Sequence, residues 1–176
     1  MTTALLIIDV QHALCTGPDA VVNGELTIAN INLLSQKARA AGMPVIFVQH
    51  EDQGALLQGS PGWQLASGLQ RHATDLDVRK RGSDAFHHTG LEALLRSLGV
   101  TQLVVCGMQT EFCVESTVRR ALALGFPVTL AADGHTTAPN GVLSVADVVA
   151  HHHATLSNLG AYGVRTTITP VAEIAF

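Results

Sequence analysis

The amino-acid sequence predicts an α/β fold in which helices cover both faces of a mostly parallel sheet. Short apolar runs rich in β-branched residues alternate with helical patterns through the whole chain. The runs themselves do not alternate polar with apolar residues, which is typical of strands buried on both sides. Hydrophobic residues make up 47% of the 176 residues and charged residues 14%, so the chain has enough apolar side chains for a sheet of this kind.

Six runs are candidate strands. In chain order they are Ala4–Val10, Pro44–Gln49, Asp77–Arg81, Gln102–Gly107, Pro127–Asp133 and Gly163–Thr169. The run Asp77–Arg81 is the most polar and has the weakest strand pattern.

Helical patterns fall between these runs, and each ends at a glycine, a common helix stop. They are Leu26–Gly42, Thr89–Gly99, Cys113–Gly125 and Val145–Gly160. The Gly/Ser/Pro-rich stretch Gln53–Gln64 is expected to be a long surface loop. No repeat or linker divides the chain, so we expect one domain over residues 1–176.

Charge and composition argue against several classes of partner. The net charge is −4 and no basic stripe is present, so we expect no nucleic acid as a partner. No apolar run reaches the roughly 18 residues that span a bilayer, and the N-terminus lacks the basic segment of a signal peptide. The three cysteines form no close pairing pattern, which favours free thiols and a cytoplasmic location.

Three reactive side chains come at or just after the ends of predicted strands. Asp9 ends the first run, Lys80 lies near the end of "DVRK", and Cys113 opens the helix after "QLVVCG". Because functional sites of open α/β sheets form at the carboxyl ends of the strands, all three side chains are expected to reach one cleft.

These residue types suit cleavage of an acyl bond. Lys80 and the helix N-terminus are expected to lower the pKa of the Cys113 thiol. Asp9 is expected to take the thiol proton and deliver it to a leaving nitrogen. Backbone N–H groups between Gly107 and Cys113 would bind the oxyanion, with Thr110 as the N-cap of the helix.

Four segments together resemble the isochorismatase-like cysteine hydrolases, the superfamily that includes nicotinamidases and related amidases. "ALLIIDVQ" is similar to the family's opening strand, and "KRGSDAFHHTGLEALLRSLGV" to its lysine segment. "LVVCGMQTEFCVESTVRRALALGFPVTLAADGHTT" is similar to its nucleophile segment, and "SPGWQ" precedes the lysine segment as in one branch of the family. The resemblance runs from Ala4 to about Leu159.

The resemblance implies a three-layer α/β/α fold with a mostly parallel six-stranded sheet. It implies Cys113 as nucleophile, Asp9 as general base and acid, and Lys80 as their electrostatic partner. It also implies a cis peptide bond between Met108 and Gln109, which would direct the N–H of Gln109, together with that of Cys113, at the oxyanion. A homo-oligomer acting on a small molecule without a cofactor is expected on the same ground.

Two departures from the family pattern bear on the substrate. The nicotinamidase metal motif, Asp-x-His with a further histidine, is absent after Asp52, and Leu14 replaces a usual aromatic residue. Nicotinamide is therefore a poor candidate, while Cys113 favours cleavage of a C–N bond in a small amide or lactam through a thioester. The alternatives are a vinyl-ether or ester hydrolase of the isochorismatase type and a non-catalytic ligand-binding or scaffold protein.

Gln11, Trp63 and Phe86 are candidate walls of the substrate pocket. An oligomer contact is an equal alternative for Trp63, and core packing is the close alternative for Phe86. These assignments leave the identity of the substrate open.

Two histidine-containing stretches are further candidates. His50–Asp52 could bind a metal, although a solvated loop is favoured, and we assign no metal site. His151–His153 cannot all face one ion, because adjacent helical residues point in different directions. One of these three is expected to pack inward near the ends of the strands.

Overall fold

The computed structural model describes residues 2–176, and its centre is one six-stranded parallel sheet. The strands are β1 (Thr2–Ile8), β2 (Val45–His50), β3 (Leu76–Lys80), β4 (Val100–Met108), β5 (Val128–Thr136) and β6 (Thr166–Thr169). Their order across the sheet is β3-β2-β1-β4-β5-β6, so the chain starts in the middle and fills first one half and then the other. This is the predicted α/β architecture.

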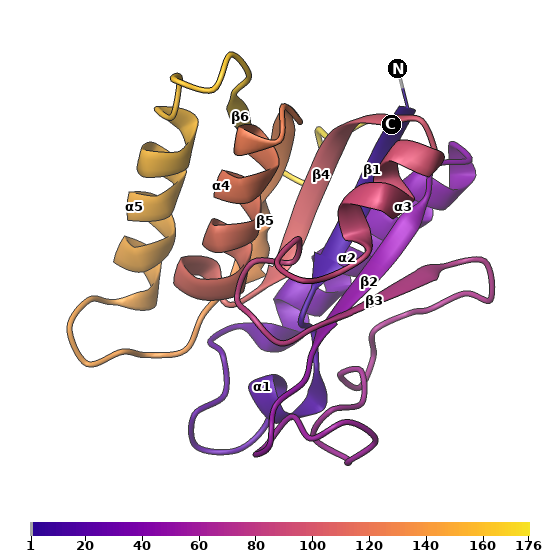
Figure 1. Ribbon diagram of the computed structural model, residues 1–176. Coiled ribbons are helices and arrows are strands. Elements are labelled where there is room, and N and C mark those ends of the chain that lie inside the picture. Colours follow the sequence, from indigo (N-terminus) through magenta and orange to yellow (C-terminus); the bar gives the residue numbers. More distant parts are fainter. Residues whose placement is uncertain (1) are drawn as a thin grey trace.

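Helices cover both faces of the sheet (Figure 1). They are α1 (His12–Cys15), α2 (Gly24–Ala40), α3 (Leu91–Ser97), the π-helical turn η1 (Thr110–Val114), α4 (Glu115–Ala123) and α5 (Val145–Ser157). The helices α3, α4 and α5 pack on one face, and α2 packs on the other together with the C-terminal segment. Between residues 2 and 176, no helix is both long enough and apolar enough to cross a bilayer.

The central strand β1 shows why the apolar runs are continuous. Ala4, Leu6 and Ile8 face the core under α3, α4 and α5. Leu5 and Ile7 face the core under α2. Because side chains alternate between the faces of a sheet, a strand covered on both sides needs an apolar residue at every position.

All six predicted strands are present, including the polar one. β3 lies at an edge of the sheet, where Asp77 and Arg79 are exposed while Val78 and Lys80 are buried. Edge strands tolerate this polarity because one side of the strand meets solvent. The short helix α1 was not predicted, since four residues are too few to show a helical period.

One glycine sets how closely β4 approaches β1. Gly107 pairs with Ile8 in the parallel register and has a φ of 123°, in the region that side chains disfavour. A Cβ atom here would overlap the carbonyl oxygen of Ile8 and lie 2.6 Å from its backbone nitrogen. The close contact therefore positions the two strands that lead to Asp9 and Cys113.

We expect Gly107→Ala to lower the free energy of unfolding by about 4 kcal/mol or more, because backbone atoms cannot move aside. Gly125→Ala is the matched control: its φ is also positive, at 85°, but no atom lies within 4 Å of the new Cβ. The control should lose about 1–2 kcal/mol. Urea-induced unfolding measures both values, and equal losses would contradict the role of the close contact.

Candidate active site

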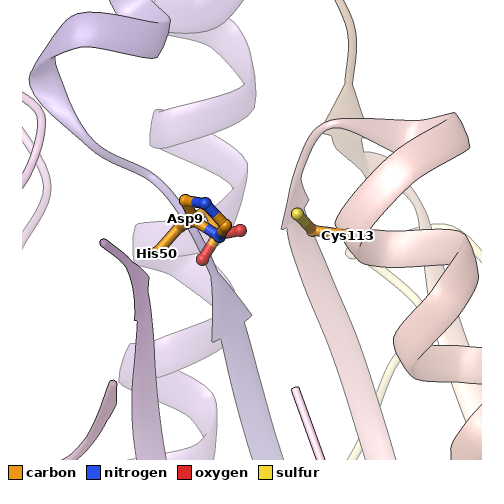
Figure 2. A group of neighbouring side chains, drawn as sticks. All are labelled: Asp9, His50 and Cys113. Carbon is orange, nitrogen blue, oxygen red and sulfur yellow. The ribbon is translucent and has the colours of Figure 1, made fainter. Parts of the chain in front are cut away.

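Side chains from three separate strand ends meet at one point. Asp9 follows β1, Lys80 ends β3, and Cys113 lies in η1 just after β4. The Lys80 Nζ lies 2.6 Å from Asp9 Oδ2 and 3.1 Å from Cys113 Sγ. Figure 2 shows Asp9 on one side of the site and the Cys113 sulfur on the other. The structure thus brings together the three residues that the sequence placed at strand ends.

Lys80 is the inward-facing member of three consecutive basic residues. Its side chain is 0% exposed, whereas those of Arg79 and Arg81 are 52% and 80% exposed. Both arginines form ion pairs with Glu51, on the outside of the edge strand. The two-residue alternation of β3, which also buries Val78, settles which charge enters the site.

Four acceptors surround the Lys80 ammonium. Besides Asp9 and Cys113, they are Nδ1 of His50 at 3.2 Å and the carbonyl oxygen of Gly82 at 3.1 Å. An ammonium group has three N–H donors and no acceptor, so each of these four atoms can interact only with a donor or with the positive charge. His50 was not part of the predicted constellation. It ends β2, which lies between β1 and β3 in the sheet. Its place at the end of an apolar run was the feature of the sequence that could have identified it as a site residue.

Asp9 is buried in an unusual backbone conformation. It is 1% exposed and has a φ of 50°, which asparagine and aspartate tolerate better than most residues. Burial raises the pKa of the Asp9 carboxyl, while the neighbouring Lys80 opposes that shift. Its Oδ1 has no hydrogen-bond partner among residues 2–176. The carboxylate therefore keeps one oxygen available to receive a proton.

The thiol of Cys113 is protonated in the resting site. Burial raises its pKa to about 12, the nearby Asp9 charge adds to the shift, and Lys80 only partly opposes it. Lys80 does lower this pKa, as expected, but the expected net decrease is wrong, because desolvation and the Asp9 carboxylate outweigh the ammonium. The thiol must therefore lose its proton to a base before or during attack.

The turn that carries Cys113 is π-helical. The peptide bond between Met108 and Gln109 is cis, as the family resemblance implied. The N–H of Val114 then bonds the carbonyl oxygen of Gln109, five residues back, at 3.2 Å. The N–H of Cys113 precedes this bond, in the first turn, where N–H groups are not needed by the helical ladder.

Thr110 does not cap this helix. Its Oγ1 lies 2.8 Å from Nδ1 of His135, a buried residue of β5, and no side chain caps the turn. The predicted N-cap is therefore wrong, because the chain enters the helix through a π turn and the hydroxyl is directed toward β5. His135 Nε2 in turn lies 2.8 Å from Nε2 of His153. His153 is thus the inward-packing member of His151–His153, as expected, while His151 is exposed.

The three predicted pocket residues differ in their surroundings. Gln11 is 0% exposed; its Nε2 donates to the carbonyl oxygens of His50 and Trp63, and its Oε1 accepts from the N–H of His50. Trp63 is partly buried. Phe86 is 8% exposed and stacks on Phe126 in the core, which matches the core-packing alternative. A contact of any of the three with substrate stays a prediction.

The residues His50–Asp52 have separate partners. His50 contacts Lys80, Glu51 pairs with the two arginines, and Asp52 accepts the N–H groups of Gly54 and Leu56. Metal-binding atoms of Asp9, His50 and Cys113 do lie within 4.8 Å of one another. The ammonium of Lys80 lies within 3.2 Å of an atom of each, so a positive charge already occupies this set of donors.

Comparison with known proteins gives the family. A sequence model of the isochorismatase domain matches residues 3–168. The chain belongs to the isochorismatase family. Relatives within it include the streptothricin hydrolase of Streptomyces noursei, 39% identical over 136 residues that cover 76% of this chain and 49% of the relative. The ureidoacrylate amidohydrolase of Pseudomonas syringae is 32% identical, covering 78% of this chain and 72% of that protein.

Solved isochorismatase structures share the whole fold. An isochorismatase from Pseudomonas putida superposes with a TM-score of 0.89 at 30% identity, covering 98% of this chain and 89% of that one. The chain spans about half the length of the streptothricin hydrolases it matches. The family assignment therefore rests on the domain, and the chemistry must be argued from the residues of this chain.

Replacement of Lys80 by Met should destabilise the protein by about 3–5 kcal/mol at pH 8, because it leaves the Asp9 carboxylate buried and unpaired. The raised pKa of Asp9 means that the folded state holds its proton more tightly than the unfolded state. The free energy of unfolding therefore falls as the pH rises from the unfolded-state pKa of Asp9 to its folded-state pKa. Loss of Lys80 raises the folded-state pKa and so extends this pH range upward. The defect should shrink at pH 5.

Urea-induced unfolding at pH 5 and pH 8 checks this prediction. Arg81→Met is the matched control, because it removes an exposed charge next in sequence and should cost less than about 1 kcal/mol at either pH. A Lys80→Met defect that does not change with pH would contradict the assigned coupling to Asp9.

Proposed function

We propose that this chain is a cysteine-dependent hydrolase that cleaves a C–N bond of a small amide or lactam through a thioester acyl-enzyme. One observation carries the proposal: a buried ammonium lies 3.1 Å from the Cys113 sulfur and 2.6 Å from the Asp9 carboxylate. A nucleophile, a proton acceptor and a compensating charge are the groups that acyl transfer needs. The names of two relatives, a hydrolase and an amidohydrolase, support the same reaction class.

In the first half-reaction, Cys113 Sγ attacks the substrate carbonyl carbon while its proton passes to Asp9. The C=O bond becomes a C–O⁻ single bond, which the N–H groups of Gln109 and Cys113 would stabilise. The C–N bond then breaks as Asp9 returns the proton to the leaving nitrogen. The products are an amine, or ammonia, and a thioester on Cys113.

Water completes the cycle. The water oxygen attacks the thioester carbonyl carbon while Asp9 takes a proton from the water. The C–S bond then breaks. The leaving thiolate of Cys113 receives the proton back from Asp9, and a carboxylic acid departs. Lys80 stays charged throughout, so it stabilises whichever of Asp9 or Cys113 is negative at each stage.

We further propose a small-molecule substrate, a homo-oligomeric enzyme and a cytoplasmic location. The free state of Cys15, Cys106 and Cys113 supports a reducing compartment. The single-domain reading of residues 1–176 belongs to the same proposal.

Replacement of Cys113 by Ala should reduce turnover of any amide that the protein hydrolyses by at least about 10⁴-fold, because it removes the nucleophile. A panel of small amides and lactams, with release of ammonia or amine as the readout, identifies the substrate and the reaction together. Cys15→Ala is the control, since this half-buried thiol contacts the Met108 sulfur and is not one of the groups around the Lys80 ammonium. Turnover that survives in Cys113→Ala would refute the proposal, and product without amine release would indicate an ether or ester hydrolase.

Asp9→Asn should have opposite effects on two reactions of Cys113. Amide hydrolysis should fall by about 10³-fold or more, because no group can move the proton. Alkylation by iodoacetamide at pH 8 should become faster, because removal of the Asp9 charge lowers the raised pKa of the thiol. Release of ammonia or amine over time measures the rate of hydrolysis, and mass spectrometry of the labelled protein measures the rate of alkylation. A parallel loss of both would show that Asp9 acts on the position of the thiol and not on its proton.

A further inference from the structure

A chain of three side chains connects the turn that carries Cys113 to the helix α5. Thr110, the first residue of η1, is 1% exposed, and His135 of β5 is 4% exposed. The Thr110 Oγ1 lies 2.8 Å from Nδ1 of His135, and Nε2 of His135 lies 2.8 Å from Nε2 of His153. His153 is a partly buried residue of α5, so these contacts link the turn, the sheet and a covering helix.

These contacts are hydrogen bonds for either placement of the ring protons. Burial lowers the pKa of His135 to about 3 and also lowers that of His153, so at neutral pH both rings are uncharged with one N–H each. If His135 Nε2–H donates to His153, Nδ1 of His135 accepts the Thr110 hydroxyl proton. If His153 Nε2–H donates instead, Nδ1–H of His135 donates to the Thr110 oxygen. A hydroxyl can act in both ways, so the link includes all three side chains.

The link fixes the first residue of η1, while the active site holds the nucleophile further along the same turn. There, Cys113 Sγ contacts the Lys80 ammonium at 3.1 Å. No side chain caps η1, because the Thr110 hydroxyl is directed to His135. A shifted partner in a buried polar network leaves a donor or an acceptor unpaired. The Thr110 side chain is therefore restricted to the position that His135 sets.

We propose that His135 and His153 are positioning residues that hold Thr110 in place at the start of η1. Thr110 lies between Gln109 and Cys113, whose N–H groups are the proposed oxyanion donors. Such donors stabilise an oxyanion only while they point at it, so a turn that can shift loses part of this effect. In this role the two rings act through Thr110 and not by contact with the substrate. The inference rests on the proposed function, because it takes these N–H groups as oxyanion donors.

Acetaldehyde tests the donors without knowledge of the natural substrate. Cys113 Sγ adds to its carbonyl carbon: an S–C bond forms, the thiol proton passes to Asp9, and the C=O bond becomes a C–O⁻ single bond. The adduct blocks labelling of Cys113 by iodoacetamide, so the aldehyde concentration that halves the labelling rate reports how well the donors bind the oxygen. The labelling rate without aldehyde is the second readout. A turn that merely loosens would expose the thiol, lower its raised pKa and speed the labelling.

Thr110→Val removes the hydroxyl at the same size, and Thr110→Ser keeps it. The half-protecting concentration of acetaldehyde should rise about 10-fold in Thr110→Val and in His135→Leu, rise no further in the double variant, and stay within about twofold in Thr110→Ser. The labelling rate without aldehyde should stay within about threefold in each variant. Circular dichroism checks that the variants fold, and His135→Met replaces His135→Leu if the latter does not.

The outer ring has a matched control on the same helix. His153→Leu should raise the half-protecting concentration about threefold or more, because His135 loses its partner, whereas His151→Leu alters an exposed residue and should leave the concentration unchanged. The inference is overturned by an unchanged concentration in Thr110→Val, by losses that add in the double variant, by equal effects of His151→Leu and His153→Leu, or by faster labelling without aldehyde. Failure of the proposed function gives a different result, in which acetaldehyde does not slow labelling of the unaltered protein, and the inference then falls with it.

Discussion

The buried ammonium of Lys80 is the constraint on which the rest of the site depends. Removing a charge of this kind from water costs several kcal/mol, which only close acceptors can offset. The acceptors come from the ends of β1 and β2, from the loop after β3 and from the turn after β4. Because each of these segments must stay near the same nitrogen atom, the lysine ties the edge strand to the centre of the sheet.

In this arrangement the thiol is protonated at rest and becomes a nucleophile only when it attacks the substrate. The pKa values of Asp9 and Cys113 are both raised by burial, so the resting pair holds a proton instead of exposing a thiolate. The ammonium lies within 3.1 Å of both groups that exchange this proton, so it can stabilise the negative charge on either of them. Attack on a bound carbonyl can therefore generate the sulfur nucleophile at the moment it is needed, while the raised pKa of the thiol limits its side reactions.

Much of the fold could be predicted from the sequence, because strands buried on both faces need continuous apolar runs. The sequence of the edge strand β3 does not show which basic side chain faces the site. Without the register of the strand, Arg79, Lys80 and Arg81 are equal candidates, and only the family resemblance selected Lys80. The thiol pKa was predicted in the wrong direction because the depth of burial around Cys113 depends on contacts among distant segments. Thr110 matched the pattern of an N-cap, but the chain enters this helix through a π turn and the hydroxyl contacts His135 instead. His50 was considered only as a metal ligand, and its contact with Lys80 was missed, because no motif distinguishes it from any other polar residue at the end of a strand.

Gln11 connects the strand ends of the site to the loop that contains Trp63. Its amide fixes the backbone of His50, and the same Nε2 donates to the carbonyl oxygen of Trp63 at 2.9 Å. Gln49 donates to that oxygen as well, at 2.9 Å. The loop that contains Trp63 is thus anchored through its backbone, and its side chains are free to differ without loosening the anchor. A change of substrate can then arise from the loop while the ammonium, carboxylate and thiol keep their distances, because the two buried amides hold main-chain atoms and make no demand on the side chains above them.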